Sequence, residues 1–296
     1  MDPTDTPQRL YGGRFLLVFA ILFAYMCGHS MLVHLPKYVV ALGGDIATVG
    51  GIFGIGMVGS LVTRPFVGRW IDRAGCRTVL LAATLLAAAS VFAFPWVQRI
   101  ELVLGLRVLV QMALAAMLAT VAVLAARIAP PGRSAECLAM IGIGGLGGLM
   151  VGPIIGDVIF GRGVESNPSF IAFFSIAAGV HAGAFLLALA TPSTRIALDA
   201  GIRRPPFWRL MVDHWPGAIL VVALCLAFAQ AIPVMFIERF VVERDIGRVT
   251  LFFAAYSPTA IGLRVVLRRL PARLGRKRTL LLGMAAYVIG LLLLTR

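Results

Sequence analysis

The chain has 296 residues, of which 60% are hydrophobic and 14% are charged. Soluble globular proteins are about half apolar and about a quarter charged, so this composition excludes an ordinary soluble domain and indicates an integral membrane protein. The formal net charge of +14 does not indicate a nucleic-acid-binding protein, because the basic residues lie between apolar stretches in the pattern typical of membrane proteins.

Nine apolar stretches are long enough to cross a bilayer, since a spanning helix needs about 20 mainly apolar residues. We predict them at 14–35, 46–66, 78–98, 101–127, 137–160, 168–190, 215–237, 247–265 and 279–295. The expected fold class is therefore an all-α membrane protein with about nine transmembrane helices. The first stretch is too long for a signal-peptide core and has no small-residue cleavage site after it, so we expect it to remain as an anchor.

The distribution of basic residues predicts the orientation. With a cytoplasmic N-terminus, nineteen Lys and Arg residues lie on the inner side and seven on the outer side, as the positive-inside rule requires. We therefore expect a multi-pass protein of the cell membrane, in contact with the lipid bilayer and with no nucleic acid. Arg107 is the one basic residue deep inside a predicted span.

Histidine and aromatic side chains occur in several of the spans. His29 and His34 lie in or near the first span and His181 lies in the sixth; an imidazole there either carries protons near neutral pH or packs in the core. We take His29 and His181 as candidate proton sites.

A set of aromatic residues either lines a pocket for an apolar substrate or faces lipid. This set is Tyr25, Phe53, Phe92, Trp96, Phe174 and Phe228.

The connection between the second and third spans, residues 67–77, combines glycine, acid and arginine. Gly68 and Gly75 permit tight turns, and Asp72 is placed to pair with nearby arginines and to face a helix N-terminus. Arg73 and Arg77 complete the pattern. The alternative is an ordinary positive-inside loop.

Arg107 and Gln111 in the fourth span form a polar stripe. They are four residues apart, so they share one face of a helix. An unpaired charge at this depth costs at least about 2.5–3.5 kcal/mol, so Arg107 must face a cavity or a partner. A structural bond to a backbone carbonyl is the competing interpretation.

The fifth span carries glycines at successive steps of four, followed by an acid. Close packing of two backbones is predicted along this face, and Pro153 is expected to bend the helix. We expect the face to meet the helix at 247–265. Asp157 follows as either a proton site or a helix cap. The glycines are Gly144, Gly148, Gly152 and Gly156.

The chain contains two copies of one unit. Residues 45–81 align without a gap with 245–281 at ten identical positions, where composition alone gives about three. Residues 191–214, rich in proline and arginine, separate six spans from three. We therefore divide the chain into 1–190, a cytoplasmic linker at 191–214, and 215–296. A duplicated membrane unit favours transport.

These motifs resemble those of the major facilitator superfamily. The pattern from Gly68 to Arg77 resembles the family's signature loop, although Cys76 replaces a basic residue, and the second copy has Ala272 in place of the acid. Arg107 matches the arginine of its fourth-helix motif, with Gln111 where glycine is usual. The span-five glycines with Pro153 resemble its antiporter motif, and generic small-residue packing is the alternative.

The resemblance implies a fold of two six-helix bundles, of which the second is incomplete here. Residues 1–190 form the first bundle, and 215–296 supply three helices of the second. By the offset of the repeat, roughly 100 further residues would complete a symmetric transporter. We expect a truncated chain that associates with itself to cover the missing helices.

The resemblance implies secondary active transport by alternating access. The expected mode is proton-coupled efflux of small amphipathic compounds, and no cofactor or metal is expected. Arg107 and Gln111 would couple transport to protons, and the loop at 67–77 would act in gating. A sugar or organic-acid symporter of the same fold is the alternative, as is a fragment that transports nothing. An intramembrane enzyme is not expected, because an aspartyl type needs two membrane-embedded acids, whereas only Asp157 comes close to being one, and no Gly-x-Ser-Gly nucleophile is present.

Overall fold

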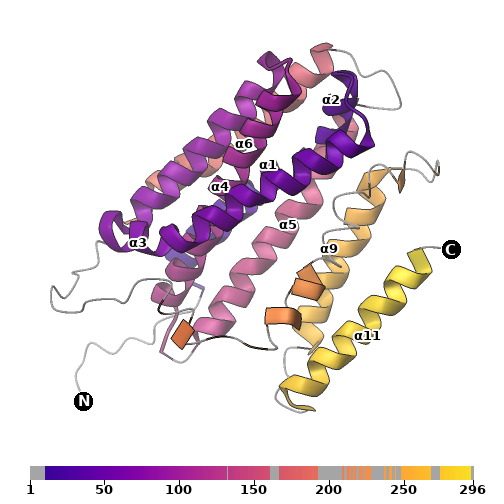
Figure 1. The fold of residues 1–296 in the computed structure, drawn as a ribbon. Helices are drawn as coiled ribbons and strands as arrows, with labels where there is room; N and C mark the ends of the chain where they lie inside the picture. The colour runs from indigo at the N-terminus through magenta and orange to yellow at the C-terminus, as the bar shows by residue number, and fades with distance from the viewer. Residues whose placement is uncertain are drawn as a thin grey trace, which may run out of the picture.

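The computed structural model describes residues 11–131, 133–160, 167–192, 248–267 and 274–294, together with scattered residues between 209 and 244. The described part of the chain is helical, in agreement with the predicted class (Figure 1). Its elements are α1 (Gly13–Met31), η1 (Leu32–His34), α2 (Leu35–Ala41), α3 (Ile46–Ala93), η2 (Phe94–Trp96), α4 (Ile100–Ile128), α5 (Ser134–Phe160), α6 (Asn167–Leu189), α9 (Val249–Val266) and α11 (Arg276–Leu294).

Six helical segments among the described residues are long and apolar enough to cross a membrane. Two of the predicted spans, 46–66 and 78–98, lie together in the segment Ile46–Trp96, which this count treats as one. The ninth predicted span coincides with α11. The predicted span at 215–237 lies largely outside the described residues, so the count of nine stays a prediction.

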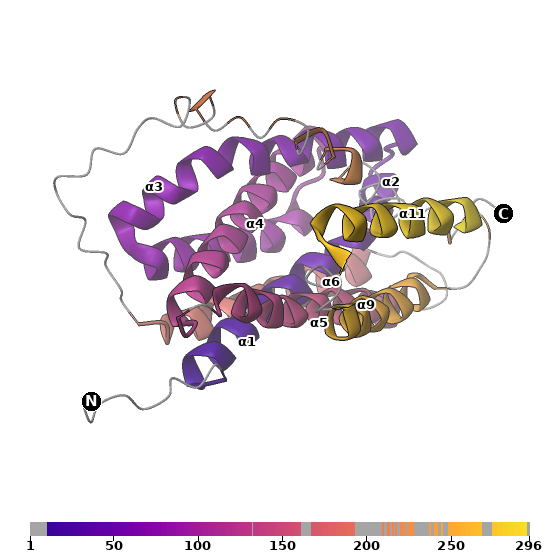
Figure 2. The same ribbon diagram turned by 90° about the horizontal axis from the view of Figure 1, so that it is seen from below.

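Gly75 divides α3 into two arms. A straight helix of 48 residues would be about 70 Å long, more than twice the roughly 30 Å of a hydrocarbon core. Gly75 has φ 84° and ψ 158°, a conformation that side chains with a Cβ rarely adopt. The chain reverses there, as Figure 2 shows, so each arm has the length of one span.

The prediction of a tight turn at Gly68 is wrong. Gly68 lies inside the first arm with ordinary helical geometry. The helix continues through the polar residues that follow because arginine and alanine are good helix formers, and a single left-handed glycine is enough to reverse the chain. The segment from Gly68 to Ala74 is therefore an extension of the helix beyond its apolar part.

The sequence repeat is matched by local structure. Gly275 has φ 81°, close to the 84° of Gly75 at the equivalent position. Phe53 and Phe253 are both buried, with 5% and 1% of their surface exposed. The two arms of α3 thus correspond to α9 and α11, which follow one another in the same order around the second glycine.

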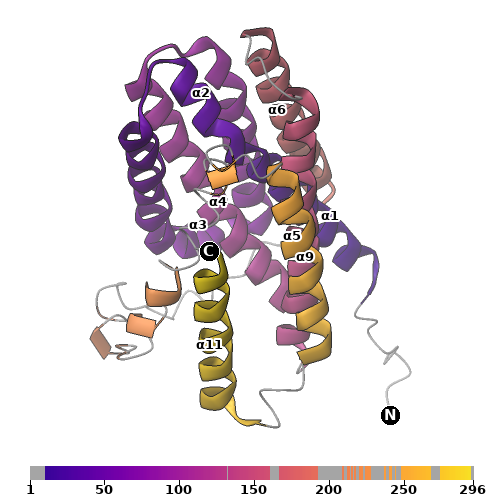
Figure 3. The ribbon, with the colours of Figure 1, turned by 90° about the vertical axis from the view of Figure 1, so that its right-hand side faces the viewer.

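Helices α1 to α6 pack into one body, with α1 against α5 and α6 and with α3 against α4 and α6. Helix α9 packs on α5, as Figures 1 and 3 show, whereas α11 has mostly exposed side chains. The core of the body consists of two apolar clusters. The first surrounds Phe15, Ile21, Leu80 and Met117 near the start of α1, and the second surrounds Leu35, Phe53, Phe94 and Phe174 at the other end.

Candidate central polar site

Polar side chains occupy the level at which the two apolar clusters meet. Helix α1 gives Ile21 to the first cluster and Met31 to the second, and α6 likewise gives Ala184 and Ala178. Between these positions lie polar residues of α1, α4 and α6, which we call the polar layer. Its members are Tyr25, His29, Arg107, Gln111 and His181.

Arg107 is the charged member of the polar layer. Its side chain is 4% exposed, and its guanidinium carbon lies 4.7 Å from the centre of the Phe53 ring. A cation–π contact of this kind contributes about 0.5–2 kcal/mol, less than the cost of burying the charge. A Cβ on Gly56 would lie 2.7 Å from Cγ of Arg107, so glycine there leaves room for the arginine.

Two groups of Arg107 remain available for binding. Its Nε and Nη1 atoms are buried and have no hydrogen-bond partner among the described residues. The predicted bond to a backbone carbonyl is therefore not found at these atoms. Donors of this kind in a membrane interior suit a water molecule, a substrate acceptor or an anionic group.

Gln111 lies next to Arg107 on the buried face of α4, as the four-residue spacing predicts. Its Nε2 lies 3.0 Å from the thioether sulfur of Met57, a weak acceptor. Its Oε1 is buried without a hydrogen-bond partner in the described part of the chain. Gln111 thus adds an acceptor beside the donors of Arg107.

Tyr25 brings the two histidines of the polar layer together. Its ring centre lies 5.0 Å from that of His181, edge to face, and 6.3 Å from that of His29, nearly parallel. The charge of Arg107 acts electrostatically on both Tyr25 and His29. Tyr25 entered the sequence analysis only as an aromatic residue, and its position four residues before His29 is the signal that places both on one helix face.

His181 has one occupied and one unoccupied ring nitrogen. Nδ1 lies 2.8 Å from the carbonyl oxygen of Ala177, so it donates the hydrogen bond and carries the proton in the neutral ring. Nε2 is then the acceptor, and it has no partner within the described residues. Gly28 lets the ring approach α1, because a Cβ there would lie 2.6 Å from Cε1 of His181.

The other predicted aromatic residues divide between core and surface. Phe53 and Phe174 are buried, whereas Phe92 and Trp96 are 52% and 59% exposed. Phe228 lies outside the described residues. Among the described members of this set, Tyr25 belongs to the polar layer and Phe53 contacts it through Arg107.

The residues of the predicted gating loop lie away from the polar layer, around the bend of α3. Arg77 donates a hydrogen bond from Nη2 to the carbonyl oxygen of Leu189, 3.0 Å away, at the end of α6. Asp72 is partly exposed and Arg73 is exposed. Arg77 therefore ties the second arm of α3 to the C-terminus of α6, where a positive charge is favourable.

The glycine face of α5 packs against α1, which contradicts the expected contact with the helix at 247–265. A Cβ on Gly148 would lie 2.7 Å from the backbone nitrogen of Cys27, and one on Gly152 would lie 2.9 Å from that of Met31. A Cβ on Gly144 would likewise crowd Phe19, and a Cβ on Gly156 would crowd the ring of His34. Nε2 of His34 lies 3.3 Å from the carbonyl oxygen of Pro153.

A different face of α5 meets α9. Asp157 accepts hydrogen bonds from the backbone N–H of Thr250, 2.9 Å away, and from its hydroxyl. Asp157 therefore caps α9 and not its own helix, and its role as a proton site stays a prediction. His34 Nε2 lies 3.7 Å from Asp157 Oδ1. No sequence signal singled out Thr250, because its partner is 93 residues distant.

Comparison with known proteins places these features in a family. A family model described as the Major Facilitator Superfamily matches residues 15–295, nearly the whole chain. A comparison with curated proteins found no match. Six helical segments of the described residues are long and apolar enough to cross a membrane, and the family is one of membrane transporters. The chain belongs to the Major Facilitator Superfamily.

Proposed function

We propose that the protein is a secondary active transporter that exports small amphipathic compounds in exchange for protons. The observation that carries this proposal is the polar layer, in which Arg107 lies buried among Tyr25, His29, Gln111 and His181. Buried polar groups without hydrogen-bond partners are costly and rare in a membrane interior, so they mark a place where polar ligands bind.

The fixed charge of Arg107 supports coupling to protons. A proton taken up by His29 adds a second positive charge to the layer that already holds the guanidinium. A cationic substrate in the same layer meets the same repulsion. Protonation and substrate binding therefore disfavour each other, which is the coupling that exchange requires.

Export also requires that the polar layer open to each side of the membrane in turn. We propose that residues 1–190 and 215–296 move against each other about the contact between α5 and α9, with the N-terminus in the cytoplasm. The residues Gly68, Asp72, Arg73, Gly75 and Arg77 then lie on the cytoplasmic side and act in gating. The close contact between α1 and the glycines of α5 would keep the first body intact during this motion.

The test is transport in vesicles that contain the purified full chain. With a proton gradient imposed, a fluorescent amphipathic cation is expected to be exported by the wild type, and Arg107→Ala is expected to abolish proton-dependent export while insertion is kept. Arg99→Ala is the matched control, since Arg99 is exposed just before the start of the same predicted span. Full transport by Arg107→Ala would exclude the proposed role of the arginine.

A symporter that imports a sugar or an organic acid is the second candidate. One observation favours it: Nε and Nη1 of Arg107 have no hydrogen-bond partner among the described residues, and each can donate a charge-assisted hydrogen bond to a carboxylate. Uptake of a labelled carboxylate in the same vesicles, driven by an inward proton gradient and lost in Arg107→Ala, would select this function over export.

A further inference from the structure

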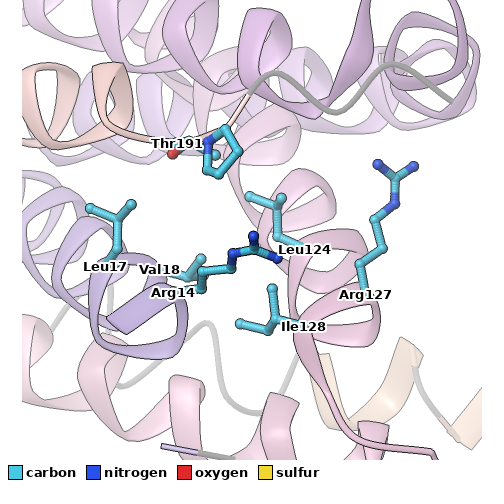
Figure 4. A pocket seen from close by; sticks show the side chains of 8 residues that line it. Arg14, Leu17, Val18, Leu124, Arg127, Ile128 and Thr191 are labelled. Atoms are coloured by element: carbon cyan, nitrogen blue, oxygen red, sulfur yellow. The ribbon is translucent and has the colours of Figure 1, made fainter. Parts of the chain in front are cut away.

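A cavity of about 130 Å³ opens at the end of the helical body where α1 begins. Its walls come from the first turns of α1, the last turns of α4 and the residues that follow α6 (Figure 4). Arg127 and Gln111 are sixteen residues apart on α4, about 24 Å along the helix axis, so the cavity is separate from the polar layer. A volume of this size holds several water-sized groups.

The opening of the cavity is positively charged. Arg14 of α1 and Arg127 of α4 both line it and are solvent exposed, and no acidic side chain is among the lining residues that the structure describes. In Figure 4 the guanidinium of Arg14 extends between the helices toward Leu124 and Ile128. Guanidinium groups bind phosphate through paired, charge-assisted hydrogen bonds.

The interior of the cavity offers one further donor. Thr191 is 3% exposed, and its hydroxyl is buried without a hydrogen-bond partner in the described part of the chain. Such a hydroxyl is unfavourable unless something binds to it. The surrounding wall is apolar, with Val18 and Leu124 buried at 3% and 5% exposure.

We propose that this cavity binds a phosphate group, supplied either by an anionic lipid or by free phosphate. Arg14 and Thr191 carry the inference, and Arg127, which also interacts elsewhere, adds positive charge at the opening. The apolar wall suits the carbon atoms next to the phosphate of a lipid. A bound phosphate would connect α1, α4 and the end of α6, and this role does not depend on the proposed transport activity.

The experiment measures binding by the delipidated full chain. Native mass spectrometry and thermal unfolding are recorded with phosphatidylglycerol, phosphatidylcholine or inorganic phosphate. Phosphatidylglycerol is expected to bind and to raise Tm more than phosphatidylcholine. Arg14→Gln is expected to weaken this binding by at least about five-fold, the effect of losing one basic contact with an anionic lipid. Arg99→Gln, an exposed arginine at the other end of α4, is expected to change nothing.

Two variants of Thr191 keep the test valid if Arg14→Gln fails to fold. Thr191→Val removes the hydroxyl at nearly constant volume, and Thr191→Ser keeps it. Without a ligand, loss of an unpartnered buried hydroxyl leaves stability unchanged or raises it. We therefore expect Thr191→Val to lose the Tm increase given by phosphatidylglycerol while Thr191→Ser retains it.

The outcomes separate the two sources of phosphate. Protection by phosphatidylglycerol alone identifies a lipid headgroup, whereas protection or competition by inorganic phosphate identifies the free anion. Equal binding by wild type, Arg14→Gln and Thr191→Val overturns the proposal. An equal loss in Arg14→Gln and Arg99→Gln also overturns it, because the attraction would then be a general effect of surface charge.

Discussion

Asp157 on α5 caps α9 through Thr250, with the carboxylate accepting from the backbone N–H at 2.9 Å and from the hydroxyl. The first turn of a helix leaves its N–H groups without partners and carries a partial positive charge. A carboxylate there stabilises the helix both by accepting a hydrogen bond and by its opposite charge. Here the capping residue comes from another helix, and the cap therefore holds α5 and α9 together.

Replacing this carboxylate should weaken the contact between the two helices. Asp157→Ala is expected to lower the free energy of unfolding by about 1–2 kcal/mol, the usual cost of losing a charged cap. Thr250→Val should cost less, because it keeps the backbone donor. Thermal unfolding in detergent measures both. Thr259→Val, an exposed threonine on the same helix, is the control, and an unchanged Asp157→Ala variant would show that the cap contributes nothing.

The glycines of α5 provide a prediction with a matched control. Gly148→Ala should destabilise the body by about 1–3 kcal/mol, because the new methyl group overlaps the backbone of α1 at Cys27. Gly179→Ala on α6 meets nothing within 4 Å, so it should be neutral or raise stability by about 0.5–1 kcal/mol. Unfolding in detergent compares the two. Equal effects of the two substitutions would contradict the close packing of α1 and α5.

Stability and transport should respond in opposite directions at Arg107. Arg107→Met replaces a buried cation, whose Nε and Nη1 have no hydrogen-bond partner in the part of the chain that the structure describes, by an apolar side chain of similar length. We expect Tm to stay the same or to rise, since desolvation of the charge is no longer required, while proton-dependent transport is lost. A marked fall in Tm would instead assign Arg107 a structural role.

The start of α3 should respond to pH. Asp45 caps this helix, and hydrogen bonds from the Thr48 hydroxyl and backbone N–H hold the pKa of its carboxyl below the ordinary value of 3.8. A depressed pKa gives stability that is present above the unfolded value and is lost as pH falls through the folded value. Wild type should therefore lose stability below about pH 4.

Asp45→Asn tests this dependence, because asparagine also caps helices but does not titrate. The variant should show a smaller loss of Tm than wild type between pH 5 and pH 3. Identical pH profiles would show that the charge of Asp45 does not contribute to folding.

Much of the helical order could be predicted from the sequence. The apolar stretch at 101–127 became α4 over Ile100–Ile128, and the stretch at 247–265 became α9 over Val249–Val266. A bilayer requires long apolar segments whose backbone groups bond within the helix, so length and composition locate a span with little ambiguity. The repeat likewise paired Gly75 with Gly275, which share a left-handed conformation.

Which neighbouring helix each face packs against could be identified only from the tertiary structure. The four-residue spacing showed that Gly148 and Gly152 share a face of α5, but that face meets α1 and not α9. Arg107 was recognised as a buried charge, yet its neighbourhood with Tyr25 and His29 depends on how α4 packs beside α1. Periodicity determines which side chains lie on one side of a helix. The neighbour that they meet is determined by contacts between segments far apart in the chain, which no local pattern records.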